Sequence, residues 1–197
     1  MSRSPSTTPS RRGFSLIELL VVLAIMGVVG AMAIPRLNLS SNRVEAIAQQ
    51  VRSVFLTSQR TSLTRQYDVI ISIDTVKSEL RIAEDRNNSG TVDAGEVRFW
   101  RPTGQAEGNI FSVPPRGFST TSVLTSVVGS QLKLVDGLPS IVFHRDGSAS
   151  SNAEIYVSNT SKGRTEYRCI TLTRSTGRSD LYRLNGKGST ATWEIAR

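Results

Sequence analysis

The sequence predicts an α+β fold, with a long N-terminal helix, hydrophobic at first and amphipathic beyond, packed on an antiparallel β-sheet domain. The helix is indicated by an uncharged apolar run over residues 19–34 and by apolar residues at three- and four-residue spacing over residues 44–55. The sheet domain is indicated by short β-branched and aromatic runs over residues 66–197, which are separated by Gly, Pro, Asn and Asp.

Residues 1–13 form a basic leader that is rich in Ser, Thr and Pro. They include Arg3, Arg11 and Arg12 and no acidic residue. Such a composition is typical of a segment without stable structure. Positive charge before an apolar helix favours a cytoplasmic location for the leader, so the residues after the helix are expected on the other side of a membrane.

The apolar run makes residues 14–35 a predicted transmembrane helix. Phe14 to Ile34 is 21 residues long, which corresponds to about 30 Å of helix, enough to span the hydrocarbon core of a bilayer. Glu18 lies near its start. A carboxylate at the bilayer centre costs about 2.5 to 3.5 kcal/mol, so a charge partner from outside the chain is expected.

Two other interpretations of this segment remain open. An ordinary single-pass anchor explains the apolar run but gives no reason for Glu18. A secretory signal peptide explains the basic leader, and Ala31-Met32-Ala33 has the A-x-A form of a cleavage site. A carboxylate at the start of the apolar core is unusual for a signal peptide, and the mass of the mature N terminus separates the possibilities.

The N-terminal segment resembles that of type IV pilins and pseudopilins. The resemblance rests on Gly13 at the end of the leader, Phe14 after it, Glu18 four positions later, the apolar run and Pro35. It implies that a prepilin peptidase cuts after Gly13 and methylates the amino group of Phe14. It also implies that Glu18 neutralises the amino terminus of a neighbouring subunit during filament assembly, and that Pro35 bends the stem.

Residues 36–65 are predicted to continue the stem as an amphipathic helix, with Ser40 to Asn42 suited to N-capping. One face carries the apolar residues Val44, Ile47, Ala48, Val51, Val54 and Phe55. This face is expected to pack on the sheet of a single globular domain over residues 66–197.

Strands are predicted at nine places along the domain. They are residues 69–73, 80–82, 97–100, 132–135, 140–143, 155–157, 167–172, 181–184 and 192–195. Gly104 to Gly129, with Pro114-Pro115 and a Ser/Thr-rich tract, is expected to be a flexible insertion. Cys169 is the single cysteine and lies in a predicted strand, so we expect an inert buried thiol and no disulfide.

Two C-terminal segments resemble the GspH/FimT group of minor pseudopilins. They are residues 141–149, which include Gly147, and residues 170–178, which include Gly177. Each places a glycine at a strand-ending turn, where a positive φ is readily adopted. The resemblance implies a pilin-like fold and a minor pseudopilin at or near the tip of a type II secretion pseudopilus. The alternative is a FimT-like minor pilin of a type IV pilus, acting in pilus assembly, adhesion or DNA uptake.

The resemblance also implies location and partners. The protein would be a single-pass protein of the inner membrane with its C-terminal domain in the periplasm. Its partners would be other major and minor pseudopilins, the prepilin peptidase, the inner-membrane assembly platform and a secreted substrate, with DNA as a partner in the alternative. An enzyme is not expected, because His144 is the single histidine and no H-E-x-x-H, C-x-x-C, P-loop or G-x-S-x-G motif is present.

Residues 85–96 match the spacing of a calcium-binding loop. Oxygen ligands would come from Asp85, Asn87, Ser89, Thr91, Asp93 and Glu96. Gly90 stands at position 6, where the loop turns sharply, and calcium takes six to eight such oxygens. Calcium is therefore a candidate cofactor. The alternative is an ordinary hairpin turn without metal, because the flanking residues are predicted strands and not the helices of an EF-hand.

A second candidate site lies in the basic C-terminal region. Arg174, Arg178, Arg183 and Lys187 are candidates for phosphate contacts to DNA. In the DNA-uptake branch of the FimT-like group, the closing turn resembles Gly-Arg-x-Arg. Here the residues are Gly177-Arg178-Ser179-Asp180, with an acid in place of the second arginine. The alternative is that these basic residues are solvated positions on alternate faces of strands.

Overall fold

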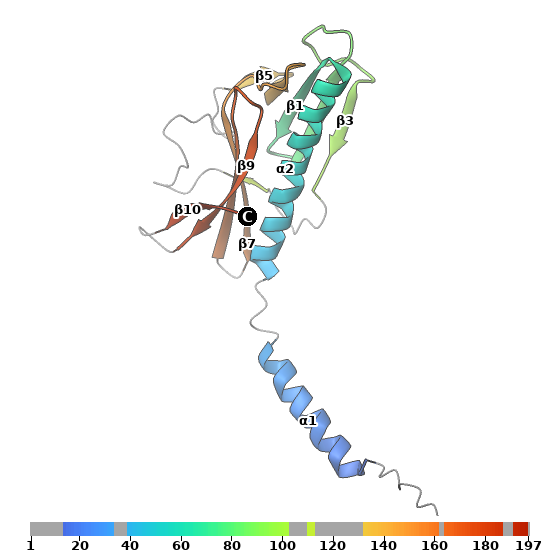
Figure 1. The fold of residues 1–197 in the computed structure, drawn as a ribbon, viewed down its shortest axis with the longest axis vertical. Coiled ribbons are helices and arrows are strands. Elements are labelled where there is room, and N and C mark those ends of the chain that lie inside the picture. Colours follow the sequence, from blue (N-terminus) through green and yellow to red (C-terminus); the bar gives the residue numbers. More distant parts are fainter. Residues whose placement is uncertain are drawn as a thin grey trace, which may run out of the picture. The chain divides into compact units, whose positions relative to one another are not determined.

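The computed structural model describes residues 14–33, 39–102, 110–112, 132–161, 164–186 and 191–196. The chain divides into two compact units, Met1–Asn38 and Leu39–Arg197. Helices and antiparallel sheets make up the described residues, which confirms the predicted α+β class (Figure 1).

The first unit contains helix α1 (Leu16–Ala33). Its first turn is closed by the carbonyl of Ser15, which accepts the amides of Glu18 (3.1 Å) and Leu19 (3.2 Å). The side chains from Leu16 to Val29 are all exposed, although nearly all of them are apolar. The helix is 18 residues long, compared with the 21 residues predicted. Within the described residues, no helix has the length and apolar character that a membrane span requires.

The second unit holds two five-stranded antiparallel sheets. The first sheet has the order β3-β2-β1-β6-β5 and the second β10-β9-β8-β7-β4. The strands are β1 (Asp68–Asp74), β2 (Glu79–Asp85), β3 (Val97–Trp100), β4 (Phe111–Ser112), β5 (Lys133–Val135), β6 (Leu138–Phe143), β7 (Ala153–Ser161), β8 (Arg164–Leu172), β9 (Ser179–Asn185) and β10 (Thr192–Ile195). All nine predicted strands are present.

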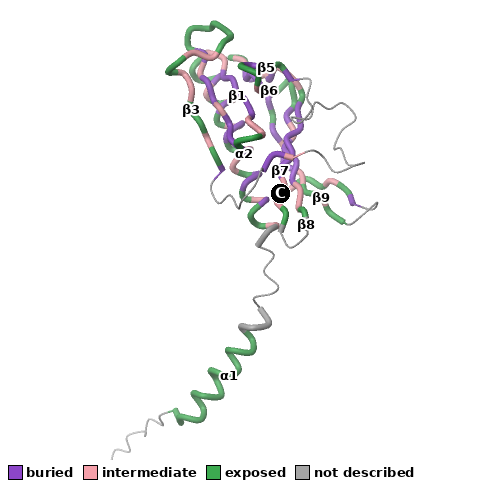
Figure 2. Tube along the Cα trace, turned by 180° about the vertical axis from the view of Figure 1, so that it is seen from behind, coloured by how far each residue is buried: buried purple, intermediate pink, exposed green. Residues whose placement is uncertain are grey.

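Helix α2 (Leu39–Arg65) contacts strands of both sheets. It begins at Leu39, slightly before the predicted cap at Ser40 to Asn42, and ends at Arg65 as expected. The six apolar residues of the predicted stripe are each 9% exposed or less, which confirms the amphipathic pattern. Figure 2 shows the buried parts of the trace gathered in α2 and the strands around it.

The main core is formed by the stripe of α2 and the inward faces of both sheets. Phe55 of α2 and Phe143 of β6 meet there, with ring centroids 6.1 Å apart. A smaller cluster of Ile70, Ala83 and Val142 with Val135 lies on the opposite face of the first sheet, because side chains alternate between faces along a strand. Both faces of that sheet are therefore partly buried.

Strand β4 corrects one expectation. The insertion predicted over Gly104 to Gly129 contains Phe111–Ser112, which pair with Val157 and Tyr156 of β7. Phe111 is buried, so burial against β7 gives order to two residues whose surroundings in sequence signal a loop. The other residues of that insertion, apart from Ile110, lie outside the described residues. Cys169 is fully buried in β8, as predicted for a structural thiol.

A buried ion pair joins α2 to the second sheet. Arg168 of β8 is 1% exposed, and its Nε donates to Glu45 Oε2 at 2.5 Å. Its other nitrogens donate to the Ser41 hydroxyl (2.9 Å) and the Tyr167 carbonyl (2.8 Å). A buried guanidinium requires such partners, because an uncompensated charge in the interior is costly.

This geometry predicts that Glu45→Ala lowers the free energy of unfolding by about 3 kcal/mol, because it leaves Arg168 buried without its main carboxylate. Urea unfolding of the full chain in detergent, followed by tryptophan fluorescence, measures the loss. Arg43→Ala, an exposed change in the same helix, is the control and should stay within about 0.5 kcal/mol. Adding Arg168→Met to Glu45→Ala should recover part of the lost free energy of unfolding. If the double variant is as unstable as Glu45→Ala alone, the buried ion pair is not the cause of the loss.

Candidate functional site

The predicted assembly segment lies in the first unit. Phe14 is 83% exposed, and Glu18 is exposed in the first turn of α1, where the helix dipole favours a negative charge. Within the described residues no Lys or Arg forms an ion pair with Glu18. Gly13 and Pro35 lie outside the described residues. As far as the structure describes it, this segment therefore carries a carboxylate without an ion-pair partner among exposed apolar side chains.

The two turns that carry the GspH/FimT-like segments meet at the C-terminal half of α2. The side-chain amide of Gln59 donates to the carbonyls of Gly147 (2.9 Å) and Thr176 (2.6 Å). Gly147 and Gly177 have φ of 81° and 61°, as predicted for glycines at these turns. A Cβ on Gly177 would stand 2.2 Å from the Gly147 carbonyl oxygen, so this close approach requires glycine. No local pattern in the sequence signals this role of Gln59.

The predicted calcium loop is closed by hydrogen bonds within itself. Asp85 is 2% exposed, and its two carboxylate oxygens accept the amides of Ser89 and Gly90, both at 2.8 Å. Asn87 donates to Asp93 at 2.7 Å. The hydroxyls of Ser89 and Thr91 lie 2.8 Å apart. Most of the predicted ligands therefore satisfy one another.

Carboxylates also form contacts at and beside the two ends of this loop. Glu96 Oε1 accepts the amide of Arg86 at 3.0 Å, and its Oε2 is buried without a hydrogen-bond partner among the described residues. Next to the loop, Glu84 accepts the Tyr67 hydroxyl at 2.6 Å and pairs with Arg86 and Arg98. The Tyr67 hydrogen bond is the largest cause that holds the pKa of Glu84 below its ordinary value.

Calcium binding stays a prediction. Within the described residues no group of three or more His, Cys, Asp or Glu side chains is placed to hold a metal ion. Asn87 occupies one oxygen of Asp93, and the Arg86 amide occupies one oxygen of Glu96. The loop offers the charge and the oxygen atoms that calcium prefers.

Two of the predicted DNA-binding arginines lie close to acidic side chains. Arg178 pairs with Asp180 at 2.9 Å, and Arg183 lies 3.7 Å from Glu45. Arg174 is exposed and lines a pocket with His144. Lys187 lies outside the described residues. His144 directly follows β6, which ends at Phe143.

Comparison with known proteins identifies one feature. Residues 8–34 match the family model described as the prokaryotic N-terminal methylation motif. No curated protein and no solved structure matches the chain. The motif supports a type IV pilin-like or pseudopilin subunit, which implies processing by a prepilin peptidase and assembly with other pilins. It indicates a structural subunit and not an enzyme, and it suggests an N-terminal membrane anchor.

The calcium prediction is tested by thermal unfolding of the full chain in detergent. If the loop binds calcium, the unfolding temperature rises with calcium concentration, by an amount equivalent to about 2.7 kcal/mol at 100 times the dissociation constant. Glu96→Gln should remove the rise, because it neutralises the carboxylate at position 12, whereas Glu194→Gln outside the loop should retain it. An unchanged unfolding temperature at millimolar calcium would show that the loop is a metal-free hairpin.

Proposed function

We propose that this protein is a minor pseudopilin of the GspH/FimT type, a structural subunit at or near the tip of a type II secretion pseudopilus. The observation that carries the proposal is the methylation motif, in which the unpaired Glu18 lies four residues after Phe14 on an apolar helix. The two C-terminal turns, which meet at Gln59, support the choice of this group.

The proposed mechanism is electrostatic and begins with proteolysis. Cleavage after Gly13 creates an α-amino group on Phe14, which the prepilin peptidase then methylates and which keeps a positive charge. Glu18 of one subunit pairs with this amine on its neighbour. In an apolar environment each of the two charges is costly alone and much less costly when paired. The exposed apolar side chains of α1 supply the contact area around the pair.

The second unit would provide the surface that contacts other subunits and the secreted substrate. Before assembly the N-terminal helix would anchor the subunit in the inner membrane, with the two-sheet domain in the periplasm. In the filament the domain would contact other major and minor pseudopilins, after insertion by the inner-membrane assembly platform. A secreted substrate would contact the same domain at the tip. The burial of the α2 stripe supports a rigid domain that can serve this role.

The runner-up is a minor pilin of a type IV pilus that contributes to pilus assembly, adhesion or DNA uptake. One observation favours it, which is the exposed Arg174 in a polar pocket. The same stem chemistry serves both machines, so the N-terminal segment does not separate them. Genes for the secretion ATPase and outer-membrane secretin of one system, next to the gene for this chain, would separate them.

Processing is tested by the mass of the mature N terminus of the protein purified from its own cells. We expect a chain that begins at Phe14 and carries one added methyl group. A Gly13 variant with a bulky side chain should retain the leader, because it replaces the glycine that ends the leader in this motif. A mature chain that begins at Ile34 would instead establish a secretory signal peptide.

Assembly is tested by Glu18→Gln, which removes the charge and keeps the size of the side chain. We expect normal cleavage and methylation but loss of incorporation into filaments, because the amine of the neighbouring subunit has no counter-charge. Co-purification with sheared filaments measures incorporation. Glu194→Gln, an exposed carboxylate of the second unit, is the matched control and should assemble normally. Normal incorporation of Glu18→Gln would refute the proposed mechanism.

A further inference from the structure

The first sheet ends at β3, whose outer edge has no partner strand among the described residues. The amide of Glu84 donates to the carbonyl of Glu96 at 3.1 Å, which continues the register of β2 and β3. Backbone groups alternate in direction along an antiparallel strand, so those of Val97 and Phe99 point away from β2. The edge of β3 therefore offers backbone amides and carbonyls to a further strand.

The side chains of β3 lie on two faces. Trp100 packs against the main core, and Val97 packs against the smaller cluster on the opposite face. Phe99 shares the face of Val97, because side chains alternate along a strand, and it is 66% exposed. Phe99 therefore presents apolar surface that a neighbouring strand would cover.

A pocket of about 340 Å³ lies between α2 and the first sheet, beside β3. Its lining combines hydroxyl groups of α2 with apolar and basic side chains of the sheet, and includes Ser53, Thr57, Thr61, Ile82, Arg98 and Trp100. A strand added to β3 would direct alternate side chains toward this face and the others toward the face of Phe99. The pocket is therefore placed to receive an apolar side chain of such a strand.

Basic groups dominate the exposed charge around β3. Arg86 and Arg98 both pair with Glu84, and Arg101 pairs with Glu79. The arginine side chains are 64% to 66% exposed, whereas those of the two glutamates are 14% and 7% exposed. Three arginines thus share two acids, and solvent meets the guanidinium groups more than the carboxylates. This edge therefore complements a partner that carries negative charge.

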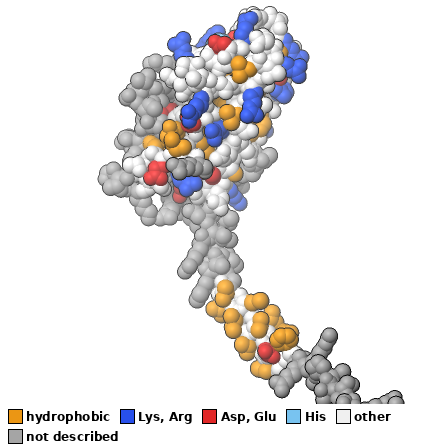
Figure 3. Space-filling model, in the orientation of Figure 1, with side chains coloured by type: hydrophobic (Ala, Val, Ile, Leu, Met, Phe, Trp, Pro, Cys, Tyr) orange, Lys and Arg blue, Asp and Glu red, His pale blue; other side chains and the backbone are white. Residues whose placement is uncertain are grey.

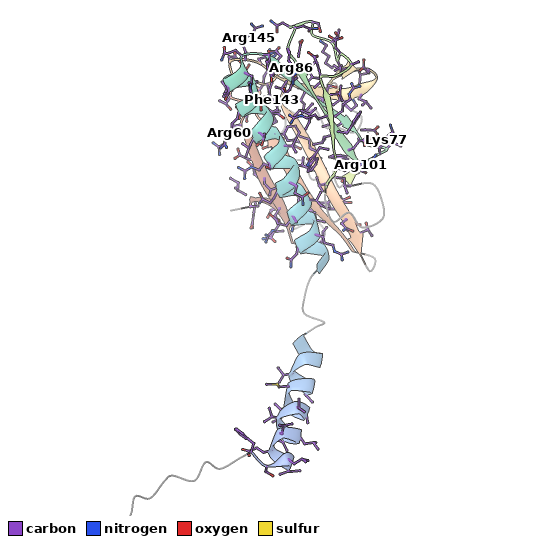
Figure 4. The ribbon with its side chains drawn as sticks, turned by 90° about the vertical axis from the view of Figure 1, so that its right-hand side faces the viewer. Arg60, Lys77, Arg86, Arg101, Phe143 and Arg145 are labelled. Atoms are coloured by element: carbon purple, nitrogen blue, oxygen red, sulfur yellow. The ribbon has the colours of Figure 1, made fainter. Side chains whose placement is uncertain are left out.

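The figures show the same distribution of charge. Lys and Arg side chains lie in Figure 3 on the side of the domain where Figure 1 draws β3. Figure 4 labels Arg86 and Arg101, which belong to opposite ends of this strand. The amide of Arg86 donates to Glu96 just before β3, and Arg101 directly follows its last residue. Positive charge therefore flanks the whole length of the free edge.

We propose that β3 binds an extended acidic segment of a partner protein, which joins the first sheet as a further strand. The backbone of the segment would pair with Val97 and Phe99, and its carboxylates would meet the exposed arginines. One of its apolar side chains would enter the pocket beside Trp100. The proposal concerns one surface of the second unit and does not rest on assembly through Glu18.

A second copy of this chain is disfavoured as the occupant. Antiparallel pairing of two β3 strands in the register centred on the strand would place Arg98 directly opposite its own copy. Like charges directly opposite each other destabilise a strand pair, and charged side chains on an edge strand oppose self-pairing. An acidic segment avoids this repulsion and replaces it with attraction.

The test uses the purified full chain in detergent and three short fluorescent peptides, with binding measured by anisotropy at low salt. The first peptide alternates Glu and Val around a central Phe, the second has Lys in place of Glu, and the third is the acidic peptide with N-methylated amides. We expect the acidic peptide to bind and the basic peptide not to bind. N-methylation should weaken binding at least about tenfold, because it removes the backbone donors and keeps the charge.

Variants of the chain locate the binding at β3. Phe99→Thr should weaken binding of the acidic peptide about fivefold, through loss of the cross-strand contact. Ile195→Thr changes an exposed apolar residue of another edge strand, β10, and is the matched control that should retain affinity. Arg98→Gln should weaken binding about threefold, and its acid keeps a second arginine. Arg145→Gln, an exposed change in the turn after β6, should leave the affinity unchanged.

Several outcomes would overturn the proposal. One is absence of binding by the acidic peptide at millimolar concentration and low salt. Equal binding of the acidic and N-methylated peptides, or equal loss in Arg98→Gln and Arg145→Gln, would show a general charge effect. Sedimentation velocity without peptide tests the other occupant, because self-association that Phe99→Thr reduces and Ile195→Thr does not would place a second copy at β3. Circular dichroism of each variant establishes that the fold is retained.

Discussion

Burial of one face of α2 is the constraint on which the second unit depends. Two sheets share this helix, and each of them has a face that cannot be left in water. The apolar stripe from Val44 to Phe55 supplies the surface that both sheets cover, so the helix holds them in one core. Apolar contact is not directional, and the stripe alone leaves the helix free to slide or rotate between several packings of similar energy.

Polar contacts at two points along α2 remove this freedom. In its N-terminal half, Glu45 receives the buried Arg168 of the second sheet. In its C-terminal half, Gln59 bonds to the turns that carry Gly147 and Gly177. Each contact has a strict geometry and a large penalty when a partner is lost. Packing therefore supplies most of the stability, while these polar contacts select one register of the helix against the sheets.

Features with local sequence signals could be predicted from the sequence, whereas contacts between residues distant in the sequence could not. The α2 stripe, the nine strands and the two turn glycines were predicted because their signals are local: a period, a run of β-branched residues, or a glycine after a strand. Gln59 bonds to residues 88 and 117 positions away, and no local pattern records such a partner. Strand β4 was missed for the same reason, since Phe111 is ordered by β7 and not by its neighbours in sequence. Arg183 lies 3.7 Å from Glu45 of α2, an acidic neighbour in space that no local pattern of the sequence records.

Charges without a partner among the described residues have different energetic consequences in the two units. Arg174 is exposed to water, where an unpaired guanidinium costs little, so its availability alone implies no ligand. Glu18 is different, because it lies among apolar side chains that need an apolar environment themselves. In such an environment an isolated carboxylate is unfavourable. The cost of an isolated carboxylate therefore favours a partner for Glu18, and a group with a positive charge offsets that cost.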